Sequence, residues 1–250
     1  MDNMLHVLSQ RTSIRKYTDQ PVPTELLNTL LTAGCRAATT GNMQVYSIVV
    51  TQNAAIKQAL APCHFNQPMI TQAPVVLTFC ADFNRFNKWC KLRNAVPGYN
   101  NFLSFTTAAI DALLAAEHFC VAAESQGLGT CYLGTTTYNA HQIIDILHLP
   151  PFVVPMATLT AGYPAETPQQ TDRLPLEGVV HYETYHDYSE TDIDRIYAHK
   201  ESLIENQQFI IENNKKSLAQ VFTDVRYTKV DNDHFSRLFL DVLRKQGFLN

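Results

Sequence analysis

Two arginines near the start of the chain enclose a pair of hydroxyl side chains. Arg11 and Arg15 flank Thr12 and Ser13. A guanidinium offers a planar fork of donors that matches a phosphate or an electron-rich carbonyl edge, and hydroxyls add further donors. A spacing of four residues suits the end of one helix. The cluster predicts an anion site, although a solvated basic patch with a capping serine explains the same residues.

A similar combination recurs much later in the chain. Arg173 lies in the segment Thr171–Pro175, beside another hydroxyl and an aspartate. One bound phosphate would account for both arginine segments.

A polar turn with one glycine lies between a predicted helix and a predicted strand. It runs from Thr39 through Gly41 and Asn42 to Gln44. Asn and Gln side chains donate and accept at once, which suits the imide edge of a flavin or a pyrimidine. A simple turn with local side-chain bonds to its own backbone fits equally well.

Other familiar catalytic patterns are weak in this sequence. The glycines of residues 127–135 lack the GxGxxG order and the Walker lysine, and they follow a helix rather than opening one. The nine histidines form no HExxH, and His181 and His186 are badly spaced for a helical metal site. We expect no catalytic metal. The shortage of acids, bases and nucleophiles suits an enzyme whose cofactor performs the chemistry.

Composition points to one principal domain with an appended tail. The chain has 250 residues, 46% of them apolar and 17% charged, with a formal charge of −4. This charge does not indicate a nucleic acid or a membrane surface as a partner. No secretion signal and no run of eighteen apolar residues occurs in the sequence. The six cysteines form no CxxC pair. We expect a cytoplasmic protein with buried free thiols.

Apolar periodicity predicts helices that alternate with strands in an α+β arrangement. Helices are expected at residues 23–34, 53–60, 105–126 and 139–147, and strands at 45–51, 75–80, 131–133 and 156–162. The alanine-rich helix 105–126 should be buried from several sides, within a domain or between two subunits. Residues 84–104 are predicted to be an irregular excursion that serves as a lid. Two polar helices, 191–213 and 232–246, predict an arm that wraps a partner.

Five ordered segments together resemble the FMN-dependent nitroreductase family, in its oxygen-insensitive nitroreductase and flavin reductase branch. They are RTSIRKYTDQPVP, TTGNMQ, QAPVVLTFCADFNR, AAESQGLGTCYLG and DRLP. The resemblance runs from about Ser9 to Pro175. As a set, the segments are far more specific than any one of them.

This resemblance implies a dimeric nitroreductase-like fold, with a central, mainly antiparallel sheet flanked by helices. Residues 1–175 would form the FMN-binding core, and residues 176–250 a helical extension of the same domain that wraps the dimer partner. FMN would lie at the interface of the homodimer. NADPH or NADH would deliver hydride to flavin N5 and leave, and a nitroaromatic, a quinone or a free flavin would then take the electrons in a ping-pong cycle.

The resemblance also assigns cofactor contacts by position. Arg11 and Ser13, with the neighbouring Thr12, would hold the phosphate and ribityl end of FMN, and Arg173 would also bind the phosphate. Arg15 would lie near the pyrimidine edge of the ring, where a fixed positive charge stabilises the anionic reduced flavin.

The remaining implied contacts lie in a turn, at one isolated glutamine and in a loop whose backbone faces flavin N5. They are Thr39, Asn42, Gln67, Tyr132, Gly134 and Thr135. No side chain is assigned a catalytic role, because the chemistry occurs at the flavin.

Two departures from the family pattern affect this assignment. Thr171 stands where close relatives have a lysine, so the phosphate site loses one cation. Lys229–Asp233 replaces the arginine-rich loop that relatives use for the NADPH 2′-phosphate, so NADH is a possible donor. An FMN-binding carrier or sensor without efficient turnover is the alternative function, and a specialised reductive or flavin-destroying reaction is a third.

Overall fold

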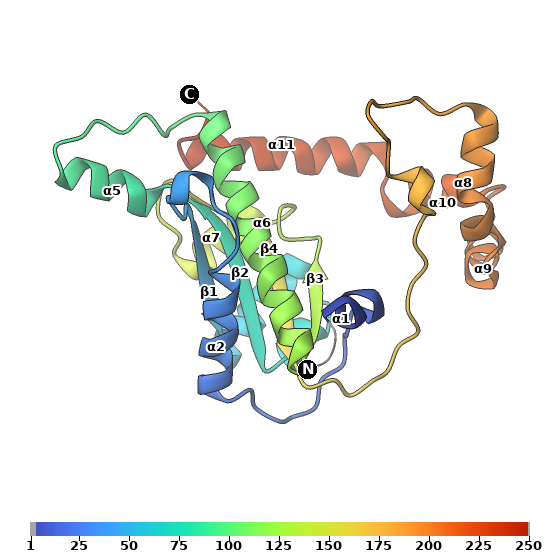
Figure 1. Cartoon of the computed structure of the whole chain (residues 1–250), viewed down its shortest axis with the longest axis horizontal. Coiled ribbons are helices and arrows are strands. Elements are labelled where there is room, and N and C mark those ends of the chain that lie inside the picture. Colours follow the sequence, from blue (N-terminus) through green and yellow to red (C-terminus); the bar gives the residue numbers. More distant parts are fainter. Residues whose placement is uncertain (1–3, 250) are drawn as a thin grey trace. The chain divides into compact units, whose positions relative to one another are not determined.

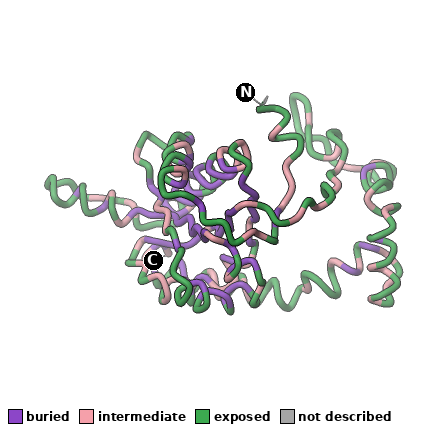
Figure 2. Tube along the Cα trace, turned by 90° about the horizontal axis from the view of Figure 1, so that it is seen from below, coloured by how far each residue is buried: buried purple, intermediate pink, exposed green. Residues whose placement is uncertain are grey.

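The computed structural model describes residues 4–249, which divide into two compact units (Figure 1). The first unit extends to Gln169 and takes in the residues from Phe235 onward, and the second spans Gln170–His234. Figure 2 shows buried residues concentrated in the core of the first unit. The strands and nearly all the predicted site residues belong to that unit.

The first unit contains a four-stranded sheet and the helices that cover it. The strands are β1 (Tyr46–Thr51), β2 (Val75–Asp82), β3 (Gly129–Leu133) and β4 (Val153–Gly162). The α-helices are α1 (Met4–Gln10), α2 (Thr24–Gly34), α3 (Ala54–Leu60), α4 (Met69–Gln72), α5 (Asn84–Leu92), α6 (Phe102–Ser125) and α7 (Ala140–Leu147). Short 3-10 helices η1 (Thr40–Asn42) and η2 (Ala61–His64) complete it.

The sheet is antiparallel throughout, in the order β1-β2-β4-β3. The α+β prediction with a mainly antiparallel sheet is therefore confirmed. Every residue of β2 is buried, because helices cover both faces of this central strand. Val75, Leu77 and Phe79 pack with α2 and α6, whereas Val76 packs with α3, α4 and α7. This alternation follows from the two-residue period of a strand.

The alanine-rich helix α6 lies across one face of the sheet (Figure 1). Its small side chains, among them Ala112, Ala115 and Ala116, are fully buried, and they let the neighbouring elements approach closely. A Cβ on Gly34 of α2 would lie only 3.2 Å from the Cβ of Phe119. The predicted burial of α6 is therefore confirmed for the face that packs on the sheet and on α2.

The opposite face of α6 is apolar and exposed. Ile110, Leu113 and Leu114 are exposed by 51%, 43% and 39%. Among the described residues, α6 alone has the length and mean hydropathy of a membrane span, but half of its most apolar window is buried inside the protein. Core helices of globular proteins share this property, so the helix by itself does not indicate a membrane.

Two predicted segments differ from the structure. Residues 84–104 are not wholly irregular, because α5 occupies residues 84–92 and α6 begins at Phe102, which leaves residues 93–101 as the loop. The predicted helix 191–213 is broken at Leu203, whose extended ψ of 132° ends α8 (Glu190–Ser202) and begins α9 (Ile204–Glu212). Asn206 Nδ2 donates to the Lys200 carbonyl at 2.7 Å and so satisfies a group left open by the break.

The second unit is helical. Besides α8 and α9 it holds η3 (Leu176–Gly178), α10 (Leu218–Val221), a π-helical turn (Phe222–Arg226) and the start of α11 (Lys229–Lys245). A capping box at Ser189 and Asp192 begins α8. The end of α11 belongs to the first unit, where Val242 and Leu243 are buried beside Phe105 of α6.

Candidate functional site

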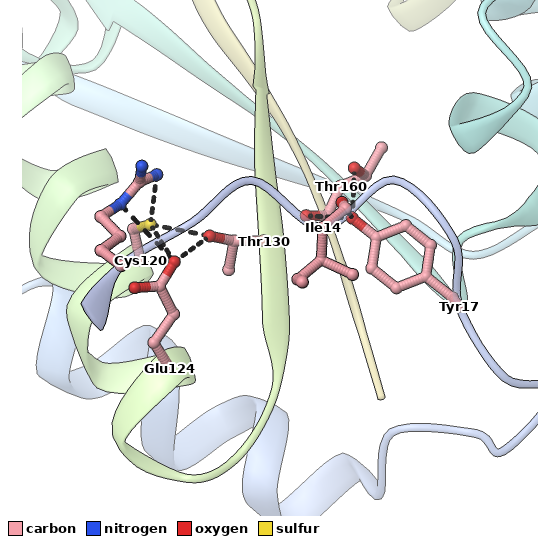
Figure 3. A network of polar contacts seen from close by, with 7 residues as sticks. Ile14, Tyr17, Cys120, Glu124, Thr130 and Thr160 are labelled. Atoms are coloured by element: carbon pink, nitrogen blue, oxygen red, sulfur yellow. Dashed lines mark hydrogen bonds and ion pairs between the residues drawn. The ribbon is translucent and has the colours of Figure 1, made fainter. Parts of the chain in front are cut away.

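The arginine and hydroxyl segment follows α1 as an extended chain beside β3 and β4. α1 ends at Gln10, just before Arg11. The prediction that both arginines lie at the end of one helix is therefore wrong for Arg15. The N–H of Ile14 donates to the Thr130 carbonyl at 2.9 Å. The Tyr17 hydroxyl donates to the Ile14 carbonyl at 2.6 Å and lies 2.7 Å from a threonine hydroxyl of β4 (Figure 3). These bonds satisfy the polar groups of the extended segment, which a helix would have satisfied internally.

A glycine in β3 permits this close approach. A Cβ on Gly129 would lie 2.5 Å from the Cβ of Ile14, closer than any real side chain allows. The absence of a side chain at Gly129 therefore allows the segment to lie directly against β3.

The Arg11 side chain is held by a cluster from α6 and β3. Its Nη2 donates to Cys120 Sγ at 3.2 Å, and its Nε lies 3.5 Å from Glu124 Oε1. Thr130 Oγ1 donates to the same carboxylate oxygen at 2.7 Å and lies 2.9 Å from Cys120 Sγ (Figure 3). Burial raises the pKa of the Cys120 thiol to about 11, so the thiol is neutral at pH 7. The guanidinium is thus oriented by one carboxylate and one neutral thiol, and Thr130 holds both of these groups in place.

The hydroxyl residues of this segment run beside the end of β3. Ser13 is hydrogen-bonded to the Cys131 thiol, and Thr12 is half-buried between Arg11 and Ser13. Arg11 Cζ lies 6.0 Å from the ring centroid of Tyr132, at the outer limit of a cation–π contact. Burial raises the pKa of the Tyr132 hydroxyl. The structure therefore brings Arg11, Thr12 and Ser13 together with Tyr132.

Arg15 is placed differently from Arg11. Its side chain is exposed, while its N–H donates to Glu166 Oε1 at 2.8 Å and the N–H of Lys16 donates to the same oxygen at 3.1 Å. One carboxylate therefore fixes the backbone here and leaves the guanidinium at the surface.

The polar turn is anchored by a carboxylate that the sequence interpretation did not single out. Asp111 of α6 is 1% exposed. Its Oδ1 accepts from Thr40 N–H at 3.0 Å and from Thr40 Oγ1 at 3.2 Å, and its Oδ2 accepts from Thr39 Oγ1 and from Val45 N–H at 3.3 Å. The sequence does carry one sign of this anchor, namely a charged residue inside an otherwise alanine-rich helix. A carboxylate buried there needs several hydrogen-bond donors from neighbouring segments.

The turn itself has an unusual backbone. Gly41, Asn42 and Gln44 have φ of 56°, 54° and 49°, in the left-handed region. Gln44 Nε2 donates to Asn42 Oδ1 at 2.6 Å, and the Asn42 side chain is exposed.

The turn and the arginine segment are anchored at separate places along α6. Asp111 and Cys120 are nine residues apart, which corresponds to about 14 Å along a helix axis. Within one chain, the structure therefore does not gather Thr39 and Asn42 beside Arg11 and Ser13.

The loop after β3 meets the segment that carries Gln67. His64 Nδ1 lies 2.8 Å from Thr135 Oγ1, and the His64 carbonyl accepts the Gln67 N–H at 3.1 Å. A Cβ added to Gly134 would meet no atom within 4 Å, so the backbone of this loop presents an open side. Thr135, Gly134 and Gln67 thus belong to one region, which continues along β3 to Tyr132. His64 was not among the residues singled out from the sequence.

Arg173 lies in the second unit and makes local contacts. Its Nη1 donates to Thr171 Oγ1 and to the Asp172 carbonyl, each at 2.9 Å. Asp172 is also paired with Lys200, whose Nζ lies 2.8 Å from its Oδ2. Thr171, which replaces the expected lysine, therefore supports the arginine directly.

Thiols and metal ligands are distributed as follows. The cysteines are free, with Cys35 exposed and the other five buried, which confirms buried free thiols except at Cys35. Over residues 4–249, no group of three or more side chains could hold a metal ion.

Comparison with known proteins identifies the family. The model of the nitroreductase family matches residues 8–163, more than half of the chain. The chain belongs to this family. It is therefore an oxidoreductase, and FMN is the cofactor that the family uses.

Similar proteins match over nearly the whole chain. The FMN reductase [NAD(P)H] of Bacillus subtilis strain 168 is 33% identical over 254 residues, covering 99% of this chain and 98% of the relative. The oxygen-insensitive NADPH nitroreductase of Salmonella typhimurium is 29% identical over 249 residues, covering 99% of each. A crystal structure of a candidate oxidoreductase from Bacteroides fragilis superposes with a TM-score of 0.97 at 59% identity, covering 98% of this chain and 100% of that one. The predicted nitroreductase-like fold is confirmed.

Proposed function

We propose that the protein transfers hydride from NADPH or NADH through FMN to nitroaromatics, quinones or free flavins in a ping-pong cycle. The observation that carries the proposal is that donor groups gather along one strand: Arg11 and Ser13 lie beside β3, and Gly134 and Thr135 lie in the loop that follows it. The relatives named FMN reductase and NADPH nitroreductase support the same chemistry.

The donor set of this line fits FMN. Arg11, Thr12 and Ser13 offer a guanidinium and two hydroxyls to the phosphate and ribityl end, where an anion is bound best by charged and neutral donors together. Glu124 neutralises part of the Arg11 charge, so we expect Arg11 to bridge Glu124 and the phosphate.

The ring end is served by other groups. Gln67 and Thr135 offer an amide and a hydroxyl, and the open backbone beside Gly134 and Tyr132 leaves room for a flat ring. The exposed Arg15 guanidinium would supply positive charge toward the pyrimidine edge. FMN, when bound, supplies the two-electron chemistry, and the protein groups orient it and stabilise negative charge on its ring.

Arg173 is proposed as a further phosphate contact on the family resemblance. Its support by Thr171 rather than by a second cation predicts weaker retention of FMN than in relatives with lysine there.

A second copy of the chain would complete the site. The exposed side of α6 carries the apolar residues Ile110, Leu113 and Leu114, and a monomer would leave them in water. Thr39 and Asn42 are anchored at a separate place on α6, about 14 Å along the helix axis from the anchor of Arg11. An antiparallel α6 from a partner would bring that partner's turn toward Arg11. We therefore infer a homodimer whose turns serve the flavin of the opposite subunit.

Residues 176–250 are proposed to wrap the dimer partner. Within the second unit, Tyr182, Ile204 and Ile211 are exposed by 75%, 89% and 72%. Apolar side chains exposed to this degree are typical of a segment that packs on another chain.

Light scattering of the purified protein tests the dimer, with a mass near twice 28.2 kDa expected. Leu113→Lys should shift the mass toward the monomer and release FMN. A monomeric wild type that binds FMN normally would refute the two-chain site.

Anaerobic reduction by NADH and NADPH in parallel tests the function. We expect a yellow protein whose flavin absorbance bleaches with one or both donors and recovers on addition of a quinone or a nitroaromatic. Arg15→Ala should slow this reduction more than it weakens FMN retention, and Arg173→Ala should mainly weaken retention. Colourless protein that takes up no added FMN would overturn the proposal.

The alternative is an FMN carrier or sensor, which the altered Thr171 and Lys229–Asp233 positions favour. The same experiment decides between them. Bound flavin that neither NADH nor NADPH reduces at a useful rate would support the carrier.

A further inference from the structure

One buried histidine stands beside the proposed flavin loop without being part of it. His64 ends η2 and has no exposed surface. Its Nδ1 lies 2.8 Å from Thr135 Oγ1. Its Nε2 is buried and has no hydrogen-bond partner among residues 4–249. By contrast, both ring nitrogens of His181 in the second unit have partners.

These contacts indicate where the imidazole carries its proton. Burial lowers the pKa of His64 to about 4, so the ring is neutral at pH 7 and has a single N–H. A buried N–H without a partner loses a full hydrogen bond to water, and orphaned donors are rarer in proteins than under-used acceptors. The proton therefore belongs on Nδ1, which donates it to Thr135 Oγ1, and the unpartnered Nε2 keeps only a lone pair.

This arrangement has a consequence for Thr135. A hydroxyl that accepts from His64 still has its own O–H to donate. Thr135 follows Gly134, whose open side faces no protein atom within 4 Å. The polar edge of an oxidised flavin ring carries two carbonyl oxygens and two ring nitrogens that accept hydrogen bonds, and only one N–H that donates, so an O–H donor matches most of that edge.

We propose that His64 is a positioning residue that holds the Thr135 hydroxyl as a hydrogen-bond donor to an acceptor on the flavin ring edge. The proposal rests on the proposed FMN function. If His64 merely filled the core, replacing it would act independently of Thr135. As a positioning residue, it acts only through the Thr135 hydroxyl.

The tautomer is tested first, without any flavin chemistry. Nitrogen-15 NMR of histidine-labelled protein at pH 7 should show a neutral ring for His64, protonated at Nδ1, with His64→Leu identifying the signal. A proton on Nε2, or a charged ring, would overturn the proposal whether or not FMN binds.

FMN affinity is tested next, by fluorescence titration of the flavin-free protein. We expect His64→Leu and Thr135→Val each to weaken FMN about fivefold, and the double variant to be no weaker than either alone within twofold. His64→Asn, which keeps a side-chain N–H near the Nδ1 position, and Thr135→Ser should bind within twofold of wild type.

The visible spectrum of the bound flavin and the thermal midpoint complete the test. His64→Leu and Thr135→Val should alter the flavin absorption band in the same way, and His64→Asn should restore it. Additive losses of affinity, or a His64→Asn variant that folds like wild type but binds like His64→Leu, would overturn the positioning role. A wild type that binds no FMN would instead refute the proposed function.

Discussion

The middle of α6 and its carboxy-terminal end hold polar segments by different means. In the middle, Asp111 is buried without a cation, and its donors all come from residues 39–45. At the carboxy-terminal end, Glu124 and Cys120 receive Arg11 from a distant segment and Thr130 from β3. The first arrangement fixes the shape of one turn, and the second joins three separate parts of the chain.

The two sites differ in how rigidly they hold the segment that they bind. A buried carboxylate must be satisfied completely, so the Asp111 turn should be rigid and costly to disturb. The Arg11 side chain is 21% exposed and Glu124 is 12% exposed, so the ion pair is partly screened and the guanidinium can still turn toward a ligand. The rigid Asp111 site fixes the shape of the turn, and the softer Arg11 site suits anion binding.

Asp111→Asn should be the most destabilising of the changes considered. The amide replaces one acceptor oxygen with a donor that faces other donors, and the remaining bonds lose their charge. We expect the free energy of unfolding to fall by about 3 kcal/mol. Urea denaturation without added flavin measures it.

Asp145→Asn is the matched control, because Asp145 is exposed on α7, and it should change the stability by less than about 0.5 kcal/mol. An equally small loss for Asp111→Asn would show that the turn holds its own shape.

Gly129→Ala should disturb the Arg11 end by about 2 kcal/mol, because the added Cβ collides with Ile14 and pushes the extended segment off β3. Gly134→Ala is the control, since its Cβ would meet no atom within 4 Å and its effect should stay below about 0.5 kcal/mol. Urea denaturation compares the two. Equal effects would mean that the segment is not held closely against β3.

Glu124→Gln should cost only about 1 kcal/mol, because the pair with Arg11 is partly exposed and the amide oxygen can still accept from Thr130. A double-mutant cycle of Arg11→Ala with Glu124→Ala isolates the pair, and we expect a coupling near 1 kcal/mol. The same cycle for Thr39→Ala with Asp111→Ala should give a larger value. The opposite ranking would reverse the contrast between the Asp111 and Arg11 sites.

The smallest expected effect concerns how fast the cysteine thiols react, and it leaves the free energy of unfolding unchanged. Cys35 is exposed, whereas Cys120 is buried and the pKa of its thiol is raised to about 11, so about 0.1% is thiolate at pH 8. A thiol reagent should modify one cysteine rapidly in the native protein, and Cys35→Ser should abolish this phase. Persistence of the fast phase in Cys35→Ser would place a reactive thiol elsewhere, and mapping it to Cys120 would show that the Arg11 end opens readily.

Local pattern accounts for most of the fold that was predicted. The four strands and the helices α2, α3, α6 and α7 were found within a few residues, because each carries its own period of apolar residues and its own start and stop signals, whereas α1, α4 and α5 were not predicted as helices. The Asn53 cap of α3 is one example, with its side-chain oxygen accepting from the N–H groups of Ala55 and Ile56. The errors fell where local signals are weak, at the short helices α1 and α4, at α5 and at the break near Leu203.

The sequence by itself determined the α+β class, the free thiols, the arginine and hydroxyl donors and the family to which they belong. These are properties of residue type and short spacing. Only the tertiary structure decided which of those donors share a place, because the deciding contacts join residues far apart in the chain. Arg11 and Cys120 are separated by 109 positions, Thr39 and Asp111 by 72, and His64 and Thr135 by 71. No local pattern encodes such pairs, since packing against α6 and β3 sets them.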